Sequence, residues 1–426
     1  MPRAATRVGT VLLAVVATLA TLASVTTLTA CTKQSAQSTP TPSSTHTQVP
    51  LGDGILRIGT LFPATGSTAF LGGPELAGVK TAIAEINAAG GVNGKPVELV
   101  SDDSGDASTQ TAEASLADLQ KKNVDVIIGP SSSVLAQRLL SAAERARIPM
   151  ISPSATYPQL TTLDTGNIFF RTIPSTAQQG VALGTLLPSK KQLKVAVVAS
   201  SDQIGQSIVQ PLSDTLLAHG GSLVANVTLT ASSDAGAVAT QVKAAIPDAV
   251  VLDTPDNGAQ TIAMITQLVA AGFGGAKLWL TSQNLADYSQ ALPANTLTGV
   301  SGLLEGAAAS VAFQAKVKAA DPTVPNFQYA PEAYDATMLV ALAATLARDD
   351  AGMRVAAQLR AASVGGIKCT SYAECLDVLK TEPDIDYDGV SGSLNLDGAG
   401  DLSSASYGIY SYGAGGTFTR TGSTTG

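Results

Sequence analysis

Strand and helix patterns alternate along the chain from Ile55 onwards, and this alternation restricts the fold more than any other feature. A first series of apolar strand patterns reads ILRIGTLF, PVELV, VDVII, IPMI and IFFRT, with helix or turn patterns between them. A second series begins after Thr172 and reads LKVAVVAS, SLVANVTL, DAVVLD and KLWL. Strands that alternate with helices form parallel sheets covered on both faces. We therefore predict an α/β protein with two doubly wound parallel-sheet lobes.

The pattern changes from about Pro331 to the end of the chain. Helix patterns cover residues 333–347, 352–362 and 371–379. The following segment alternates apolar and polar residues and carries Asp397-Gly398 and Gly415-Gly416. Such alternation between turn signals predicts antiparallel strands. We expect residues 419–426 to be a flexible tail.

The first fifty residues have the pattern of a leader and a tether. Arg3 and Arg7 precede an apolar stretch over residues 8–25, and the motif Leu-Thr-Ala-Cys follows at residues 28–31, ending at Cys31. This is typical of a secretory signal peptide over residues 1–30, and the cysteine after it resembles the lipidated first residue of bacterial lipoproteins. Residues 31–52 are rich in Ser, Thr and Pro and predict a tether. An uncleaved membrane anchor is the alternative; we expect an exported protein, lipid-anchored to the outer face of the cytoplasmic membrane.

The remaining cysteines, Cys369 and Cys375, form an even pair with five residues between them. In an exported protein this spacing predicts a local disulfide. A metal site lacks further ligands, because the two histidines of the chain, His46 and His219, lie in the tether and before a Gly-Gly pair. The net charge is -8, with no cluster of Lys and Arg, so we expect no nucleic-acid partner.

Motifs of catalysis and of cofactor binding are missing from the sequence. The chain has no G-x-S-x-G, no phosphate-binding loop and no H-E-x-x-H. Residues 384–389 match the first half of a calcium loop, but its twelfth position is Asn395 where a bidentate acid is needed. We therefore predict no enzyme, no cofactor and no metal.

Two hydroxyl-rich loops follow neighbouring strand patterns between Val124 and Leu160. One is Gly-Pro-Ser-Ser-Ser ending at Ser133, and the other contains Ser154, Ala155 and Thr156. Ligands of open parallel sheets bind beyond the carboxyl ends of the strands, and a helix N-terminus with free N–H groups and hydroxyls suits an anion. Both loops are predicted to hold one carboxylate. The alternative is that Ser133 is an N-cap and that Ser154 and Thr156 are turn residues.

A resemblance extends over essentially the whole mature chain. The ordered segments TLFPATGSTAFLGGPELAG, VIIGPSSS, IPMISPSATYPQLT, NIFFRTIPST, WLTSQNLA and DIDYDGVSGSLNLDGAGDLSSASYGIYSY resemble type I periplasmic solute-binding proteins. The most similar group binds leucine, isoleucine and valine for ABC importers. The resemblance implies two lobes joined by three crossovers, near residues 173–176, near 298–304 and in the end segment, with the ligand in the cleft. Lobe 1 would comprise residues 53–174 and about 300–390, and lobe 2 residues 175–299 and about 391–418.

The same resemblance assigns ligand contacts. The carboxylate-binding serine of the group corresponds to Ser133, and its strand-end backbone and hydroxyl donors correspond to Ser154, Ala155 and Thr156. These are the residues that the loop chemistry selects independently.

The opposite wall departs from the pattern of the group. Amino-acid binders have an acid where this chain has Gln283. The resemblance also places aromatic side chains near Leu71, near Ile204 and near Pro255 or Asp256. A glutamine hydrogen-bonds an ammonium group but does not neutralise it, and an unpaired buried cation is costly.

Three nearby acids are candidates to supply the charge: Asp202, Asp253 and Asp256. Each has a structural alternative, as a helix cap for Asp202 and as strand-end loop residues for the other two. Without such an acid, the ligand is a carboxylate that lacks an α-amino group, or a neutral amide.

These patterns together predict a monomeric solute-binding component of an ABC importer. Its ligand is a small amino-acid-like or carboxylate-bearing solute, and its partner is a membrane permease. The alternatives are a lipoprotein that signals through a receptor and, more remotely, a cell-surface enzyme.

Overall fold

The computed structural model describes residues 50–163, 166–255, 257–306 and 308–426. The predicted signal peptide, the lipidation site Cys31, nearly all of the tether and the candidate contact Asp256 lie outside these residues. Within them, no helix is long and apolar enough to cross a membrane.

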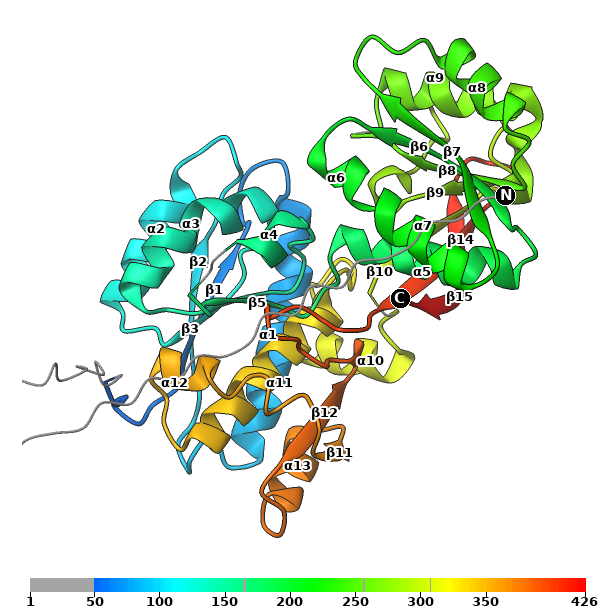
Figure 1. The fold of residues 1–426 in the computed structure, drawn as a ribbon. Helices are drawn as coiled ribbons and strands as arrows, with labels where there is room; N and C mark the ends of the chain where they lie inside the picture. The colour runs from blue at the N-terminus through cyan, green and yellow to red at the C-terminus, as the bar shows by residue number, and fades with distance from the viewer. Residues whose placement is uncertain (1–49, 164–165, 256, 307) are drawn as a thin grey trace, which may run out of the picture. The chain divides into compact units, whose positions relative to one another are not determined.

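The first sheet contains five parallel strands in the order β2-β1-β3-β4-β5. They are β1 (Arg57–Phe62), β2 (Glu98–Asp103), β3 (Val126–Ile128), β4 (Met150–Ser152) and β5 (Phe169–Arg171). Helices cover both faces of this sheet (Figure 1), as the alternating pattern predicts. One face packs against α2 (Thr111–Lys121) and α3 (Ser133–Ala146), and the other against α1 (Ala69–Ala88) and α11 (Ala330–Ala347). The short helices α4 (Gln159–Thr162), α10 (Val311–Ala320) and α12 (Gly352–Ala356) complete this group.

Helix α11 is buried along most of its length. Every residue from Ala330 to Ala344 is buried, which explains why its sequence is Ala- and Leu-rich without a polar stripe. It lies against α1 so closely that a Cβ added at Gly78 would be 2.3 Å from the carbonyl oxygen of Ala330. Glycine at this position therefore permits the contact between the two helices.

The second sheet has seven strands in the order β15-β14-β10-β9-β8-β6-β7. They are β6 (Lys194–Ser200), β7 (Ser222–Leu229), β8 (Ala249–Asp253), β9 (Leu278–Leu280), β10 (Ser301–Glu305), β14 (Ser406–Tyr412) and β15 (Phe418–Thr425). Strands β6 to β10 are parallel to one another. Strands β14 and β15 extend one edge of the sheet with antiparallel pairing. Helices α5 (Thr176–Ser189) and α7 (Val209–Ala218) cover one face, and α8 (Ala235–Ala244) and α9 (Ala259–Leu268) cover the other.

One prediction for this region needs correction. Residues 419–426, expected to be a flexible tail, form most of β15, because their backbone pairs with β14 from Phe418 to Thr425. The chain leaves the second sheet after Glu305, next to the crossover region predicted near 298–304.

A small third sheet lies beside α11 and contains β11 (Ile367–Cys369), β12 (Ile385–Gly389) and β13 (Gly392–Ser393). A disulfide joins Cys369 to Cys375 in α13 (Tyr372–Val378), which confirms the predicted pairing. The ammonium group of Lys368 contacts Asp386 at 3.0 Å and Asp388 at 2.7 Å, two acids of the segment that matches the first half of a calcium loop. No group of acidic, histidine or cysteine side chains suited to a metal occurs among the described residues.

Asp335 fixes this third sheet to α11. Its fully buried carboxylate accepts hydrogen bonds from the Tyr387 hydroxyl at 2.9 Å and from the Val390 N–H at 3.1 Å. It also accepts bonds from the N–H and the hydroxyl of Ser391, at 2.7 and 2.5 Å. One side chain of the helix thus satisfies four donors, one in β12 and three in the segment that follows it.

We predict that Asp335→Ala lowers the free energy of unfolding by about 3 kcal/mol or more, because it leaves several buried donors without an acceptor. Chemical denaturation followed by circular dichroism measures this change. The matched control is Asp377→Ala, an exposed acid paired only with Lys380. Equal stability of the two variants would contradict the assigned role of Asp335.

Candidate functional site

The two predicted loops lie at the same edge of the first sheet. Strands β3 and β4 are parallel neighbours, so the loop after Ile128 and the loop after Ser152 both leave the carboxyl ends of their strands. This is the edge at which open α/β sheets bind ligands. The expected juxtaposition of the two loops is present.

Ser133 joins these loops and is not the N-cap of α3. The N-cap is Ser132, whose Oγ accepts the N–H of Leu135 at 3.4 Å. The Ser133 Oγ accepts the N–H of Tyr157 at 3.2 Å. Its own hydroxyl hydrogen has no acceptor within the described part of the chain. The capping role considered for Ser133 therefore belongs to Ser132. The hydroxyl hydrogen of Ser133 remains available to donate a hydrogen bond.

Ser154 and Ala155 are largely satisfied inside the second loop. The Oγ of Ser152 accepts the N–H of Ser154 at 3.3 Å and the N–H of Ala155 at 2.9 Å. The Ser154 hydroxyl donates to the Glu75 carboxylate at 2.5 Å, and Ala155 is fully buried. These two residues shape the loop more directly than they present donors.

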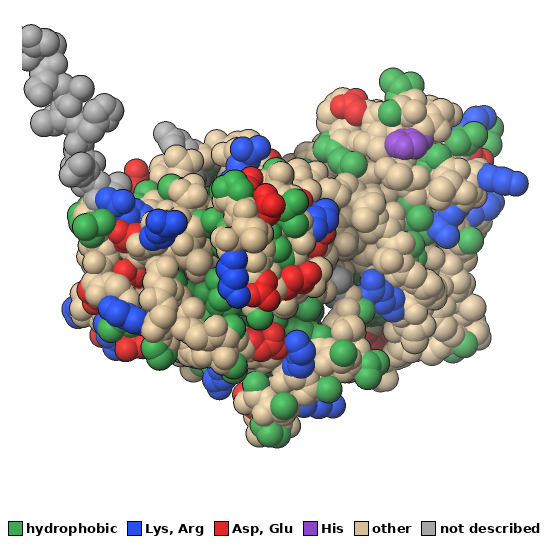
Figure 2. Space-filling view, turned by 90° about the horizontal axis from the view of Figure 1, so that it is seen from below, with side chains coloured by type: hydrophobic (Ala, Val, Ile, Leu, Met, Phe, Trp, Pro, Cys, Tyr) green, Lys and Arg blue, Asp and Glu red, His purple; other side chains and the backbone are tan. Residues whose placement is uncertain are grey.

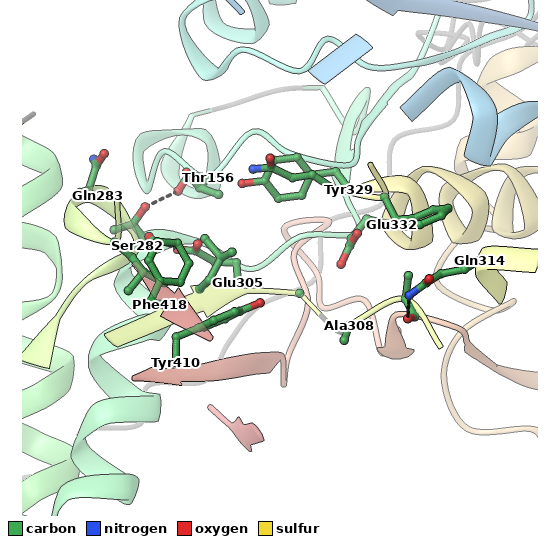
Figure 3. Close-up of a pocket in the computed structure, with 17 residues that line it drawn as sticks. Thr156, Ser282, Gln283, Glu305, Ala308, Gln314, Tyr329, Glu332, Tyr410 and Phe418 are labelled. Carbon is green, nitrogen blue, oxygen red and sulfur yellow. Dashed lines mark hydrogen bonds between the residues drawn. The ribbon is translucent and has the colours of Figure 1, made fainter. Parts of the chain in front are cut away.

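Thr156 has the most available donors of the loop. Its carbonyl oxygen accepts the N–H of Thr176 at 2.9 Å and the Thr176 hydroxyl at 3.2 Å. Its N–H and its hydroxyl make no hydrogen bond to any described residue. Thr156 also lines a pocket (Figure 3).

Glu75 lies beneath both loops and connects them. This fully buried acid of α1 accepts the hydroxyls of Ser131 and Ser154. Burial raises the pKa of Glu75 to about 7, and the two serine hydroxyls limit that rise. The carboxyl therefore loses its proton near neutral pH while it remains in contact with both loops.

Arg171 anchors the second loop from the other side. Its fully buried guanidinium pairs with Asp401, with Nε–Oδ1 at 2.6 Å and Nη2–Oδ2 at 2.7 Å. It also donates to the carbonyl oxygens of Ala155 at 3.2 Å and Tyr157 at 3.0 Å, on either side of Thr156. A bidentate pair of this kind is both strong and geometrically specific. The backbone around Thr156 is thus held through the carbonyl groups of the residues before and after it.

The pocket that contains Thr156 has a volume of about 590 Å³. Its lining comes from strands, loops and helices and includes Gln283, in the short helix Ser282–Asn284. Figure 3 shows Gln283, Ser282 and Glu305 on one side of this pocket and Tyr329 and Glu332 on another. Two predicted contact residues, Thr156 and Gln283, therefore share one pocket.

The other predicted residues lie elsewhere. Ser133, Ser154, Ala155, Leu71 and Ile204 do not line this pocket. Leu71 is half-buried in α1, and Ile204 is half-buried in α6 (Gln203–Ser207).

Asp202 and Asp253 differ in role. The carboxylate of Asp202 caps α6 by accepting the N–H of Gly205 at 2.8 Å, as the structural alternative predicted. Asp253 is 1% exposed, and its Oδ2 has no hydrogen-bond partner among the described residues. Burial, and then the negative charges of Asp202 and Glu305, raise the pKa of Asp253 to about 7.

Sequence reasoning missed several residues of the pocket wall: Glu305, Tyr329, Glu332, Tyr410 and Phe418. The signal for Glu305 is visible in hindsight, because SGLLE places an acid at the carboxyl end of a strand. The aromatic pair Tyr410 and Phe418 comes from the edge hairpin β14–β15, with ring centroids 5.5 Å apart. That contact depends on strand register, which the sequence does not specify.

A family model described as periplasmic binding protein matches residues 55–371. The chain belongs to the periplasmic binding protein family. This membership implies an exported protein, and the Leu/Ile/Val-binding relatives below confirm the predicted group.

Relatives of this chain include a protein of a chemotactic signalling system and amino-acid-binding proteins. A chemotactic signal transduction system substrate-binding protein, BasB of Halobacterium salinarum, is 26% identical over 356 residues, which cover 80% of this chain and 83% of BasB. The Leu/Ile/Val-binding protein BraC3 of Rhizobium johnstonii is 30% identical over 204 residues, 47% of this chain and 55% of BraC3. A Leu-, Ile-, Val-, Thr- and Ala-binding protein of Pseudomonas aeruginosa is 31% identical over 38% of this chain and 43% of its own length.

Solved structures of periplasmic binding proteins share the fold. LivJ of Streptococcus pneumoniae, in complex with isoleucine, is 22% identical, with a TM-score of 0.59 over 86% of this chain and 100% of LivJ. A solute-binding protein of R. palustris, in complex with benzoate, is 20% identical, with a TM-score of 0.56 over 86% of this chain and 96% of that chain. At these identities the likeness confirms the predicted type I fold.

We predict that Glu75 makes the stability of this periplasmic binding protein fall as pH rises from about 5 to about 7. The ordinary pKa of its carboxyl is 4.5 and the pKa in the folded protein is about 7. Between these values the unfolded chain releases the proton while the folded protein keeps it, so deprotonation favours unfolding. Glu75→Gln keeps an acceptor for the hydroxyls of Ser131 and Ser154 and removes the group whose titration causes this pH dependence.

The measurement is the free energy of unfolding of wild type and Glu75→Gln across this pH range. The variant is expected to gain stability relative to wild type as pH rises. Glu374→Gln, an exposed acid bonded to Thr370, serves as control. Parallel stability curves for wild type and Glu75→Gln would contradict the prediction.

Proposed function

We propose that this protein is the solute-binding component of an ABC importer and that it holds a small carboxylate-bearing, amino-acid-like solute at the strand-end loops of the first sheet. The observation that carries this proposal is the pair of hydroxyl donors at Ser133 and Thr156. Both hydroxyls lack an acceptor within the described residues. Glu75 bonds to both strand-end loops, and Arg171 holds the loop that contains Thr156. Preorganised N–H and O–H donors beside the N-terminus of α3 suit an anionic group.

The relatives support the choice of solute class. LivJ is in complex with isoleucine and the R. palustris protein with benzoate; both ligands carry a carboxylate. In the proposed mechanism the first sheet and its helices form lobe 1, which receives the carboxylate, and the second sheet and its helices form lobe 2, which closes over the solute. The ligand shifts the open–closed equilibrium only by the difference between its affinities for the two forms. A lipid on Cys31 would keep this cycle at the membrane surface.

We expect Ser133→Ala and Thr156→Ala each to weaken solute binding by about 1–3 kcal/mol, because each removes one hydrogen bond to a charged group. Isothermal titration calorimetry measures the affinity, after a thermal-shift screen of amino acids, their des-amino acids and amides has identified a ligand. Thr240→Ala, which removes an exposed hydroxyl of α8, is the control. Unchanged affinity in the Ser133→Ala/Thr156→Ala double variant would overturn the site assignment.

A sensing role is the second candidate, and one observation favours it. Among the relatives described above, BasB covers the largest share of this chain, and its name assigns it to a chemotactic signalling system. The two roles use the same binding body and differ in the membrane protein that recognises the ligand-bound form.

Affinity capture from membranes distinguishes them. The full-length protein, loaded with its solute, is expected to retain a permease. Retention of a receptor without any permease would replace the transport proposal with the sensing one. Protein without solute serves as the control for ligand-dependent capture.

A further inference from the structure

The pocket that contains Thr156 and Gln283 has an unusual charge balance. Two of the side chains that line it are acids, Glu305 and Glu332, and none of the described lining residues is Lys, Arg or His. Both acids are almost completely buried, with 6% and 2% of their surface exposed. For Glu305 no cationic partner occurs among the described residues, and a carboxylate withdrawn from water without one is energetically unfavourable.

Glu305 is the better placed of the two acids to meet a ligand. Its Oε1 accepts the Ser282 hydroxyl at 2.7 Å and the Gln179 side-chain amide at 3.1 Å. Its Oε2 receives no hydrogen bond from the described residues, and no Lys or Arg among them pairs with it. The acid is thus fixed in orientation by one oxygen and unpartnered at the other, within a wall of the pocket.

The side chain of Glu332 lies close to the backbone of Gly306, the residue after Glu305. It lies in the first turn of α11, and a Cβ added at Gly306 would be 2.3 Å from its Oε1. Gly306 has a φ of +92° and directly follows Glu305. Because Gly306 has no Cβ, the carboxylate of Glu332 can lie beside the residue that follows Glu305.

Aromatic rings complete the wall. Tyr329, Tyr410 and Phe418 line the pocket, and Figure 3 shows them together with Glu305 and Glu332. Phe327 also lines it, but the Lys318 ammonium already lies 5.6 Å from its ring centroid. A cation between aromatic faces and a carboxylate gains from both the ring quadrupoles and the opposite charge.

We propose that this pocket binds a positively charged nitrogen of the solute, with the Glu305 carboxylate as its counter-ion and the rings of Tyr329, Tyr410 and Phe418 around it. Glu305 thereby supplies, from β10, the negative charge that Gln283 lacks. The inference deepens the proposed function and rests on it: the solute carries a protonated amine or guanidinium group as well as the group held by the loops of the first sheet.

Isothermal titration calorimetry with matched pairs of probes tests this inference. Arginine and citrulline differ in side-chain charge, as do lysine and norleucine, whereas leucine and its des-amino acid differ in the α-ammonium group. For at least one pair, the charged member is expected to bind wild type at least about tenfold more tightly, the usual effect of a charge-assisted hydrogen bond. The pair that responds identifies which nitrogen occupies the pocket.

Glu305→Gln retains an acceptor for Ser282 and Gln179 and removes the charge. It is expected to reduce the preference within the responding pair to about twofold or less and to leave the uncharged member nearly unaffected. Glu374→Gln, which removes an exposed charge, should preserve the preference. If Glu305→Gln does not fold, Phe418→Leu replaces it and is expected to weaken the charged member alone by about threefold.

Two results would overturn the inference, and they differ from failure of the proposed function. Equal affinity within every pair for wild type, or an unchanged preference in a folded Glu305→Gln protein, removes the cation site while solute binding stands. If no probe and no other solute of the wider screen binds wild type, the proposed function fails and the inference fails with it.

Discussion

The buried contact between Arg171 and Asp401 is the interaction on which the loop of Thr156 depends. Desolvating both charges is costly, and such pairs persist where additional hydrogen bonds satisfy the remaining donors. Here the guanidinium also donates to two loop carbonyls and to the Thr161 hydroxyl. Because Asp401 lies 230 residues further along the chain, the loop gains its final support only when the end segment has reached the first sheet.

The remaining support of the site follows the same principle of long-range polar contacts at a sheet edge. Glu75 links the loops to α1 from below, and Asp335 joins α11 to the segment after β12. Each of these buried acids accepts several hydrogen bonds from backbone or hydroxyl groups. The strand-end loops are therefore carried by a rigid frame, which suits donors that must be preorganised for a ligand.

The sequence predicted the repeating part of the structure well. Alternating patterns gave the two parallel sheets and the positions of most strands, because apolar periodicity reports burial directly. The loops at Ser133 and Thr156 were also predictable, since the carboxyl edge of a parallel sheet follows from strand order. The even cysteine pair gave the disulfide between Cys369 and Cys375.

The rest depended on contacts between distant segments, which no local pattern specifies. In the sequence, Arg171 cannot be distinguished from any other polar residue at the end of a strand. Its role becomes visible only in the structure, where it pairs with Asp401. Glu305 becomes part of the pocket only because β10 pairs beside β9 and places its last residue next to Ser282. The polar, aperiodic sequence after Phe418 suggested a tail, yet backbone pairing with β14 does not require apolar side chains and makes it a strand.

Strand β15 gives the end of the chain a part in the pocket. Phe418 is its first residue and lines the pocket, and Gly426 forms a pair of backbone hydrogen bonds with Ala405. A shortened chain ending before Phe418 would therefore lose one pocket wall as well as the edge of the second sheet. The pairing of β15 with β14 therefore determines the shape of the pocket as well as the edge of the sheet, although the strand itself is almost entirely polar.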